Sequence, residues 1–472
     1  MSKIASDPDL PFASALEQAR LVREREVSPV ELADIYLERI ERLNDRLGTY
    51  LTVSADYARR AARAAEATAG QPGNPPFHGV PISIKDLNAT AGIRTTWGTR
   101  AWADKVPDYD DEVVARVKAD GFVILGKTVT PEFGPLNVSE PPGFPPGRNP
   151  WNPDFACGGS SGGAASGVAA GLCPVSQGSD GGGSIRNPSS WCGVFGIKPS
   201  RGRISDKPKA QQFFSVQGPI TRYVADGAAL LDAMSGPAPG DAFWAPPPAR
   251  PFLDEAGADP GKRRIAFTTV SMNAEVPVAA ANAAATEEAA RVLEGLGHYV
   301  ERVEHPLTGT NLLGPSAIMF AASYAGMAPE MPPLDRLSPW MANMVQMGKG
   351  IPAADYVVAQ NTVIDVSRRF VEWFQDWDVL VTPTVAAPPP PVGKYAEPTM
   401  AQLAELWGLT PFTAMFNTTG QPAVNIPWCL DPGGLQVGVQ IAGRPADEAL
   451  LIRLSAQLEA AHPWAHWRPP VS

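Results

Sequence analysis

The chain has 472 residues, of which 44% are hydrophobic and 19% are charged, which is typical of a globular protein large enough to enclose a cavity. Its net charge of -10 at pH 7 leaves little basic surface for nucleic acid, whose phosphates bind clustered lysine and arginine. We therefore expect a small-molecule partner and no nucleic acid. The sequence has no apolar run long enough to cross a bilayer and no signal peptide. We expect a cytoplasmic protein without a membrane partner, either a monomer or a homodimer.

The cysteines and histidines form no metal-binding pattern. Cys157, Cys173, Cys192 and Cys429 show no CxxC spacing, which favours buried free thiols. The five histidines include no HExxH pair, the helical zinc-binding arrangement. We expect no metal and no cofactor.

Residues 1–70 are expected to form N-terminal helices. Apolar and alanine positions recur at helical spacing from Pro29 to Ala69, and Ser28 with Pro29 is a favourable helix start. We predict two helices there. Short apolar runs at 80–84 and 122–125 then flank a helical pattern at 111–120. This alternation indicates an α/β sheet.

Residues 235–261 interrupt the pattern. They are rich in proline and glycine, which neither sustain a helix interior nor favour central strands, so we predict a surface loop. The run from Pro388 to Pro391 indicates a second, rigid connection. Between and beyond these segments we predict a helix at 278–296 and strands of the same sheet at 264–267, 378–382 and 436–441.

Residues 121–128 match the phosphate-loop pattern GxxxxGK[ST] letter for letter. A phosphate loop follows a strand and opens a helix, whereas the four variable positions here are Phe, Val, Ile and Leu, which favour the strand itself. Pro131 follows too closely for a helix to begin at Lys127. We predict that Lys127 lies at a strand end and that no nucleotide binds there.

Residues 158–162 match the GxSxG pattern of α/β-hydrolases. In that arrangement the serine needs a histidine base from later in the chain. An esterase of this type remains an alternative hypothesis. The histidines that could serve are His298, His305, His462 and His466, which lie near a helix end or in a tail rich in proline and tryptophan.

A wider group of residues combines two glycine-rich segments with a lysine. Lys85 ends an apolar run, Ser160 lies in residues 157–163, and Ser184 directly follows three glycines. Consecutive glycines let backbone N–H groups converge on one point, because no side chain blocks the approach. Such a cluster predicts an oxyanion hole, and a serine next to it is placed to attack the carbonyl group that the hole binds.

A serine nucleophile needs a base. Lysine is a base only when it is uncharged, and burial at the end of an apolar strand favours the uncharged amine. Lys85 is therefore a candidate base. The alternative is an ordinary salt bridge between Lys85 and Asp86.

These segments resemble the amidase signature family. The resemblance runs through residues 77–86, 126–128, 132–134, 149–152, 157–163, 178–188 and 196–199, and continues at 382–384, 417–423 and 438–441. It implies one α/β/α domain over residues 1–472, around a mixed, twisted sheet. The catalytic core would be residues 77–230, and residues 262–472 would complete the same domain.

The resemblance also implies a role for each central residue. Lys85 would be the base, Ser160 a relay held by a cis peptide bond, and Ser184 the nucleophile of an acyl-enzyme. The separation of the two serines favours Ser160 over Ser161. The backbone N–H groups of Gly181, Gly182, Gly183 and Ser184 would bind the oxyanion.

The resemblance also implies a branch of the family and a class of substrate. Segments 201–205, 239–246 and 463–469 are similar to nylon-oligomer hydrolases, and aryl acylamidases and urethane-cleaving enzymes are related. We expect an amidase for apolar, aryl or oligomeric amides, with carbamates as a further substrate class. A glutamine-hydrolysing subunit of an amidotransferase complex is an alternative. Val129 and Gly181 depart from the family pattern without touching Lys85, Ser160 or Ser184.

A methionine-rich stretch at 319–347 suits a pocket for bulky apolar groups, since thioethers adapt to varied shapes. Filling gaps in the core is the alternative role for the same side chains. Residues 141–146 would form a rigid rim beside the relay serine. The expected substrate-binding residues are Phe144, Gly159, Met319 and Met341.

Overall fold

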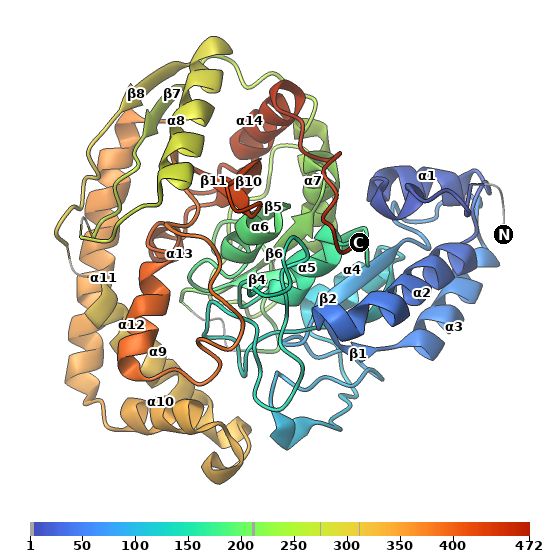
Figure 1. Cartoon of the computed structure of the whole chain (residues 1–472), viewed down its shortest axis with the longest axis horizontal. Coiled ribbons are helices and arrows are strands. Elements are labelled where there is room, and N and C mark those ends of the chain that lie inside the picture. The colour runs from blue at the N-terminus through green and yellow to red at the C-terminus, as the bar shows by residue number, and fades with distance from the viewer. Residues whose placement is uncertain (1–3, 210–212, 274, 311) are drawn as a thin grey trace.

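The computed structural model describes residues 4–209, 213–273, 275–310 and 312–472. Within these residues, eleven strands form one sheet in the order β1-β3-β2-β4-β6-β5-β10-β11-β9-β7-β8. Parallel and antiparallel pairs both occur, so the sheet is mixed. The predicted α/β/α domain around a mixed sheet is confirmed (Figure 1).

The N-terminal segment contains the two predicted helices, and also an α-helix before them and a strand between them. The structure has α1 (Ala15–Arg23), α2 (Pro29–Leu47) and α3 (Ala55–Glu66), but a strand, β1 (Tyr50–Val53), separates α2 from α3. The Ser28 side chain caps α2 as predicted. The strand forms because its aromatic and β-branched residues pair antiparallel with β3 at the sheet edge.

Most of the sheet comes from the middle and the end of the chain. The predicted strands at 80–84, 122–125, 264–267, 378–382 and 436–441 all occur in it. The strands are β2 (Pro81–Lys85), β3 (Val123–Thr128), β4 (Val175–Asp180), β5 (Phe195–Lys198), β6 (Val216–Thr221), β7 (Arg264–Phe267), β8 (Tyr299–Arg302), β9 (Val379–Pro383), β10 (Ala423–Leu430) and β11 (Gln436–Gly443). Lys127 is fully buried within β3, which confirms that the apparent phosphate loop is strand.

Helices cover both faces of the sheet (Figure 1). One apolar core joins the sheet to α4 (Glu112–Ala119), α7 (Val224–Met234), α8 (Ala280–Gly295) and α14 (Glu448–Ala461). A second core joins the other face to α2, α3 and α5 (Gly162–Ala169). The short helix α6 (Arg186–Cys192) packs against β10 and β11. Residues 235–261 contain only a 3-10 turn, at Phe252–Glu255, among the elements described, and are mostly exposed.

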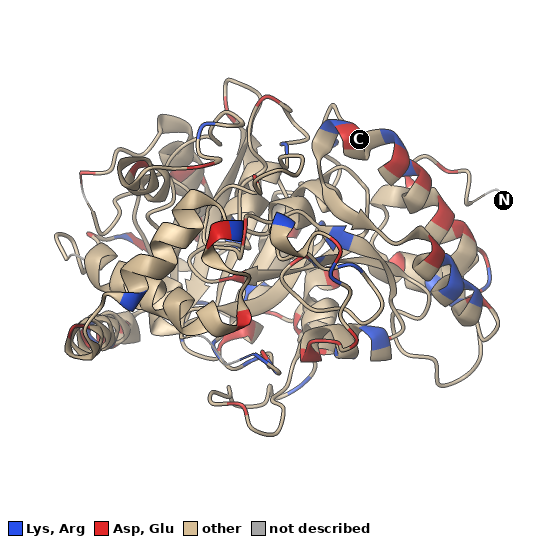
Figure 2. Ribbon diagram, turned by 90° about the horizontal axis from the view of Figure 1, so that it is seen from below, with Lys and Arg blue, Asp and Glu red and all other residues tan. Residues whose placement is uncertain are grey.

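A further group of helices lies beyond the sheet layers, at the lower left of Figure 1. It comprises α9 (Leu313–Met327), α10 (Pro339–Lys349), α11 (Ala353–Trp373), α12 (Met400–Gly408) and α13 (Ala414–Thr419). Figure 2 shows that charged residues crowd on the helices near the N-terminus and are fewer at the opposite end. Helix α9 contains no charged residue. None of the described helices combines the length and the apolar character that a membrane crossing requires.

Candidate active site

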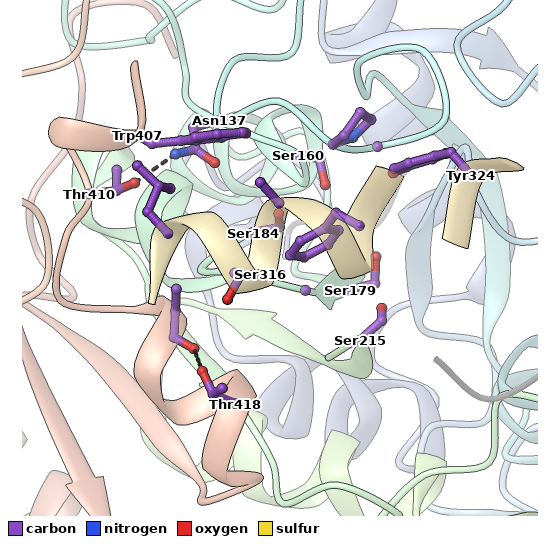
Figure 3. Close-up of a pocket in the computed structure, with 18 of the residues that line it drawn as sticks. Asn137, Ser160, Ser179, Ser184, Ser215, Ser316, Tyr324, Trp407, Thr410 and Thr418 are labelled. Atoms are coloured by element: carbon purple, nitrogen blue, oxygen red, sulfur yellow. Dashed lines mark hydrogen bonds between the residues drawn. The ribbon is translucent and has the colours of Figure 1, made fainter. Parts of the chain in front are cut away.

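A cavity of about 490 Å³ lies where several strands end at one edge of the sheet. Strands β2, β3 and β4 run parallel, so their carboxyl ends meet there, and β6 begins at the same edge because it runs antiparallel to β4. Such an edge is where open α/β sheets bind ligands. The cavity is lined by the loops after these strands and by side chains of α9, α10, α12 and α13 (Figure 3).

Lys85 lies beneath the cavity as the last residue of β2, fully buried. Its Nζ is 2.8 Å from the hydroxyl oxygens of both Ser160 and Ser161 and 2.9 Å from that of Ser179. No salt bridge joins it to Asp86 among the described residues; that carboxylate instead accepts hydrogen bonds from Thr96. Burial lowers the pKa of the Lys85 amine well below its usual value, although the Asp180 carboxylate opposes the shift. Burial, and the lack of a salt-bridge partner among the described residues, favour an uncharged amine.

The three hydroxyls around Lys85 are not equivalent. Ser161 donates its hydrogen to the Ser179 carbonyl at 3.0 Å, so that hydrogen is not directed at the amine. Ser160 has no other acceptor for its hydroxyl among the described residues, and it lines the cavity whereas Ser161 does not. A neutral amine has one lone pair to accept a hydrogen. Ser160 is therefore better placed than Ser161 to donate to it.

Ser160 and Ser184 line the same cavity and are 2% and 8% exposed, respectively (Figure 3). The peptide bond between Gly159 and Ser160 is cis. The backbone also links the two serine segments, because the Ser161 N–H donates to the Ser184 carbonyl at 3.0 Å. Within the described residues no hydrogen bond joins the two side chains. Catalytic hydrogen bonds are often long before substrate binds.

The glycine segment after β4 is fixed by a buried ion pair. Asp180 and Arg186 are both fully buried, with an Arg186 Nη2 to Asp180 Oδ1 distance of 2.9 Å. The same carboxylate accepts the N–H groups of Gly183 at 2.7 Å and Ile185 at 3.1 Å. Burial alone would raise the pKa of the Asp180 carboxyl, but the Arg186 guanidinium holds it well below its usual range. The Asp180 carboxylate therefore stays ionised and accepts the hydrogen bonds that fix the loop.

The bond from Gly183 to Asp180 changes the expected set of oxyanion donors. The Gly183 N–H is already taken and is directed at the carboxylate. Within the part of the chain that the structure describes, the N–H groups of Gly181, Gly182 and Ser184 donate to no protein acceptor. These three are available for an oxyanion, and Gly183 is not. Gly183 has φ +125°, and a Cβ there would lie 2.3 Å from Thr413 Oγ1, so only glycine fits.

The expected substrate-binding residues lie elsewhere. Phe144 and Gly159 do not line the cavity; a Cβ on Gly159 would meet the backbone of Val138 at 2.6 Å. Met319 and Met341 are fully buried in apolar cores. The helices α9 and α10 instead turn other side chains to the cavity, because only one face of each can do so. Those side chains are Leu313, Ser316, Ala317, Phe320, Tyr324, Met327, Met344 and Met347.

Several lining residues had no signal in the sequence. Asn137 and Thr410 lie side by side and are joined by a hydrogen bond of 2.6 Å (Figure 3). Ser179, Ser215 and Trp407 complete the part of the wall near Ser184. Polar single residues of this kind are scattered along the chain, so only the fold brings them together.

No histidine of the described residues lines the cavity. His298 contacts Gln457 at 2.8 Å, His462 stacks on Trp428, and His305 packs in the core beside Phe370. These positions leave the histidine-based esterase without a base at Ser160. Among the described residues, no group of three His, Cys, Asp or Glu side chains could hold a metal ion. All four cysteines are free thiols; Cys157, Cys173 and Cys192 are buried as predicted, whereas Cys429 is partly exposed.

Comparisons with known proteins agree with this geometry. The family profile described as Amidase matches residues 31–452. The 6-aminohexanoate-cyclic-dimer hydrolase of Paenarthrobacter ureafaciens is 33% identical over 97% of this chain and 96% of its own. A solved structure of 6-aminohexanoate cyclic dimer hydrolase complexed with substrate has a TM-score of 0.93 at 31% identity, covering 98% of this chain and 99% of that one.

A bacterial aryl acylamidase of the amidase signature family is also similar. Its structure has a TM-score of 0.88 at 28% identity and covers 96% of this chain and 97% of its own. The sequence match, the shared fold and the buried lysine beside the serine-lined cavity agree with one another. The chain therefore belongs to the amidase signature family and is an amidase.

Proposed function

We propose that the enzyme hydrolyses amides through an acyl-enzyme on Ser184, with Ser160 as relay and Lys85 as base. The observation that carries this proposal is the position of the buried Lys85 amine, 2.8 Å from a Ser160 hydroxyl that lines the same cavity as Ser184. The lowered pKa of Lys85 supports it, because a neutral amine can accept the proton.

The reaction has two halves. Lys85 takes a proton from Ser160 while Ser160 takes one from Ser184, and the Ser184 oxygen bonds to the amide carbon. Ser160 then gives a proton to the nitrogen and regains one from the Lys85 ammonium, the C–N bond breaks and the amine leaves, so Lys85 is again neutral. Water attacks the resulting ester by the same relay, and the acid leaves with Ser184 restored.

The oxyanion would be bound by the N–H groups of Gly181, Gly182 and Ser184. Their lack of other acceptors among the described residues leaves them free for the carbonyl oxygen as its negative charge develops. Donors of this kind contribute about 3 to 4 kcal/mol each to the transition state, because they are oriented before the charge appears.

The substrate we propose is an amide with a bulky apolar acyl or aryl group. Aromatic, methionine and leucine side chains dominate the wall, among them Trp97, Phe133, Phe320 and Trp407. Of the described lining residues only Asp206 and Lys209 are charged, and Lys209 is paired with Asp111 at 2.6 Å. The relatives that act on a cyclic amide and on aryl amides support this class. Carbamates present the same carbonyl to Ser184 and form a second substrate class.

A substrate panel tests this function on the purified chain without partner proteins. We expect anilides of bulky apolar acids and aryl carbamates to be hydrolysed faster than short charged amides. Ser184→Ala should abolish turnover, whereas Ser367→Ala on α11, outside the cavity, should not. A preference for glutamine or other short charged amides would contradict the apolar substrate class, and turnover by Ser184→Ala would contradict the mechanism.

A further inference from the structure

Two side chains, one in helix α13 and one at its N-terminus, donate hydrogen bonds to carbonyl groups of residues 180–183, which we call the glycine segment. The Asn417 side-chain amide donates to the Asp180 carbonyl at 2.8 Å. The Thr413 hydroxyl, at the start of the helix, donates to the Gly182 carbonyl, also at 2.8 Å. Both residues are buried: Thr413 is fully buried and Asn417 is 1% exposed. Neither residue belongs to the lysine and serine group.

Holding a carbonyl fixes the N–H group that follows it. In a trans peptide the C=O and the N–H are rigidly coplanar and point in opposite directions. The Gly182–Gly183 peptide is held on both sides, since Thr413 binds its oxygen and Asp180 accepts its N–H at 2.7 Å. The peptides on either side carry the N–H groups of Gly182 and Ser184, so their orientation depends on the central one.

The backbone of residues 181–183 needs hydrogen bonds from outside the loop to keep one conformation, because all three residues are glycine. Residues 181–183 have no side chains to restrict their backbone angles, and glycine reaches more backbone conformations than any other residue. A Cβ on Gly182 would meet nothing within 4 Å, so packing does not restrain that residue from the cavity side. An oxyanion hole accelerates the reaction only if its donors are oriented beforehand.

Thr413 is itself held in place by the buried ion pair. Its carbonyl accepts a hydrogen bond from Arg186 Nη1 at 2.8 Å, and Arg186 is paired with Asp180 at the other end of the glycine segment. The Thr410 carbonyl, at 3.3 Å from Thr413 Oγ1, is a more distant competing acceptor for the hydroxyl hydrogen than the Gly182 carbonyl at 2.8 Å. The buried ion pair therefore fixes Thr413, and Thr413 fixes the middle of the loop.

We propose that Thr413 is a positioning residue that orients the oxyanion hole through its hydrogen bond to the Gly182 carbonyl. The inference rests on the proposed function, because it assumes that the glycine segment binds the oxyanion. Thr413 contacts no reacting atom. Its effect falls on the transition state, in which the carbonyl oxygen is charged, and much less on the bound substrate.

The test compares Thr413→Val, which removes the hydroxyl at nearly constant volume, with Thr413→Ser, which keeps it. Thr362→Val is the matched control, because its hydroxyl bonds only the Val358 carbonyl within α11 and is outside the cavity. The probes are one anilide substrate and the trifluoromethyl ketone with the same acyl group, which forms a tetrahedral adduct with a serine.

We expect Thr413→Val to lower kcat about 100-fold with KM within about twofold of wild type, and to weaken ketone inhibition in parallel. Thr413→Ser and Thr362→Val should stay near wild type. Wild-type kcat in Thr413→Val, or equal losses in the Val and Ser variants, would overturn the proposal. If the valine variant does not fold, Thr413→Ala supplies the same comparison.

Ser184→Ala, measured beside these variants, separates the two hypotheses. If Ser184→Ala is inactive while Thr413→Val is unaffected, only the positioning role is wrong. If Ser184→Ala hydrolyses the anilide as fast as wild type, the proposed mechanism is wrong, and the positioning role falls with it.

Discussion

The floor and the roof of the cavity are built in different ways. The floor consists of Lys85, Ser160 and residues 180–184, and buried hydrogen bonds and one ion pair hold it in place. The roof consists of α9, α10 and α12, which pack through methionine, aromatic and leucine side chains. The Tyr324 hydroxyl of the roof donates to the Phe133 carbonyl at 3.2 Å, and Phe133 lies after β3, outside the floor.

This difference assigns separate tasks to the two regions. Directional hydrogen bonds fix atoms to within the tolerance that proton transfer and oxyanion binding require. Apolar packing is less directional, and methionine side chains adapt to different shapes. We infer that the floor determines the reaction and the roof determines which acyl groups fit. Substitutions in the floor should therefore change kcat. Substitutions of roof side chains that line the cavity should change the substrate preference.

The largest expected effect is at Lys85. Lys85→Met should lower kcat/KM roughly a thousandfold or more, because a general base of this kind contributes about 10² to 10⁴. Lys118→Met on α4, away from the cavity, is the control.

The pH dependence gives a second readout of the same residue. In the proposed mechanism the neutral amine is the active form, so activity should rise with pH. Because burial lowers the pKa of Lys85, the midpoint of this rise should lie well below 10.5. Rates measured from about pH 5 to pH 10 should show this rise in the wild type and not in Lys85→Met. An identical rise in both proteins would mean that another group titrates.

The next effect is on stability. Arg186→Met leaves the Asp180 carboxylate buried without its partner, which costs about 3–5 kcal/mol. Arg368→Met breaks an ion pair whose side chains are 70% and 69% exposed and should cost less than about 1 kcal/mol. Urea unfolding measures both. Equal losses in the two variants would show that the floor does not depend on its ion pair.

The smallest expected effect sharpens the role of cavity shape. Ala317 on α9 lines the cavity from the roof, so Ala317→Leu fills space beneath the roof without touching the floor. It should reduce kcat/KM for bulky anilides on the order of tenfold, with less effect on acetanilide. Gly257→Val, in the exposed loop, is the control. A uniform loss for large and small acyl groups would indicate damage to the floor instead.

The sequence predicted strands in which apolar residues predominate, such as 264–267, and missed β4, which carries several polar residues. The run at 264–267 was found because its residues favour a strand, whereas β4 contains Ser176, Gln177 and Ser179, whose side chains are buried in hydrogen bonds that only the fold provides. Polar residues in a buried strand are expected beside an active site and weaken the usual pattern.

The candidate site shows the same limit. Lys85 could be predicted because it ends an apolar strand before a glycine-rich region. Its contacts with Ser161 and Ser179 could not, because spacing along the chain gives no distance in space. Met319 was expected at the cavity, but its neighbour Phe320 lies there instead. Helical periodicity identifies the faces of a helix without saying which face meets the substrate.

The acyl-enzyme is the most direct test of the mechanism. A reaction with an anilide, stopped by acid during turnover and followed by proteolysis, allows the acyl group to be located by mass spectrometry. We predict an ester on Ser184, with none on Ser160, Ser161 or Ser179, and no adduct in Ser184→Ala. An acyl group on another serine, or turnover without any adduct, would contradict the assignment of Ser184 as the nucleophile.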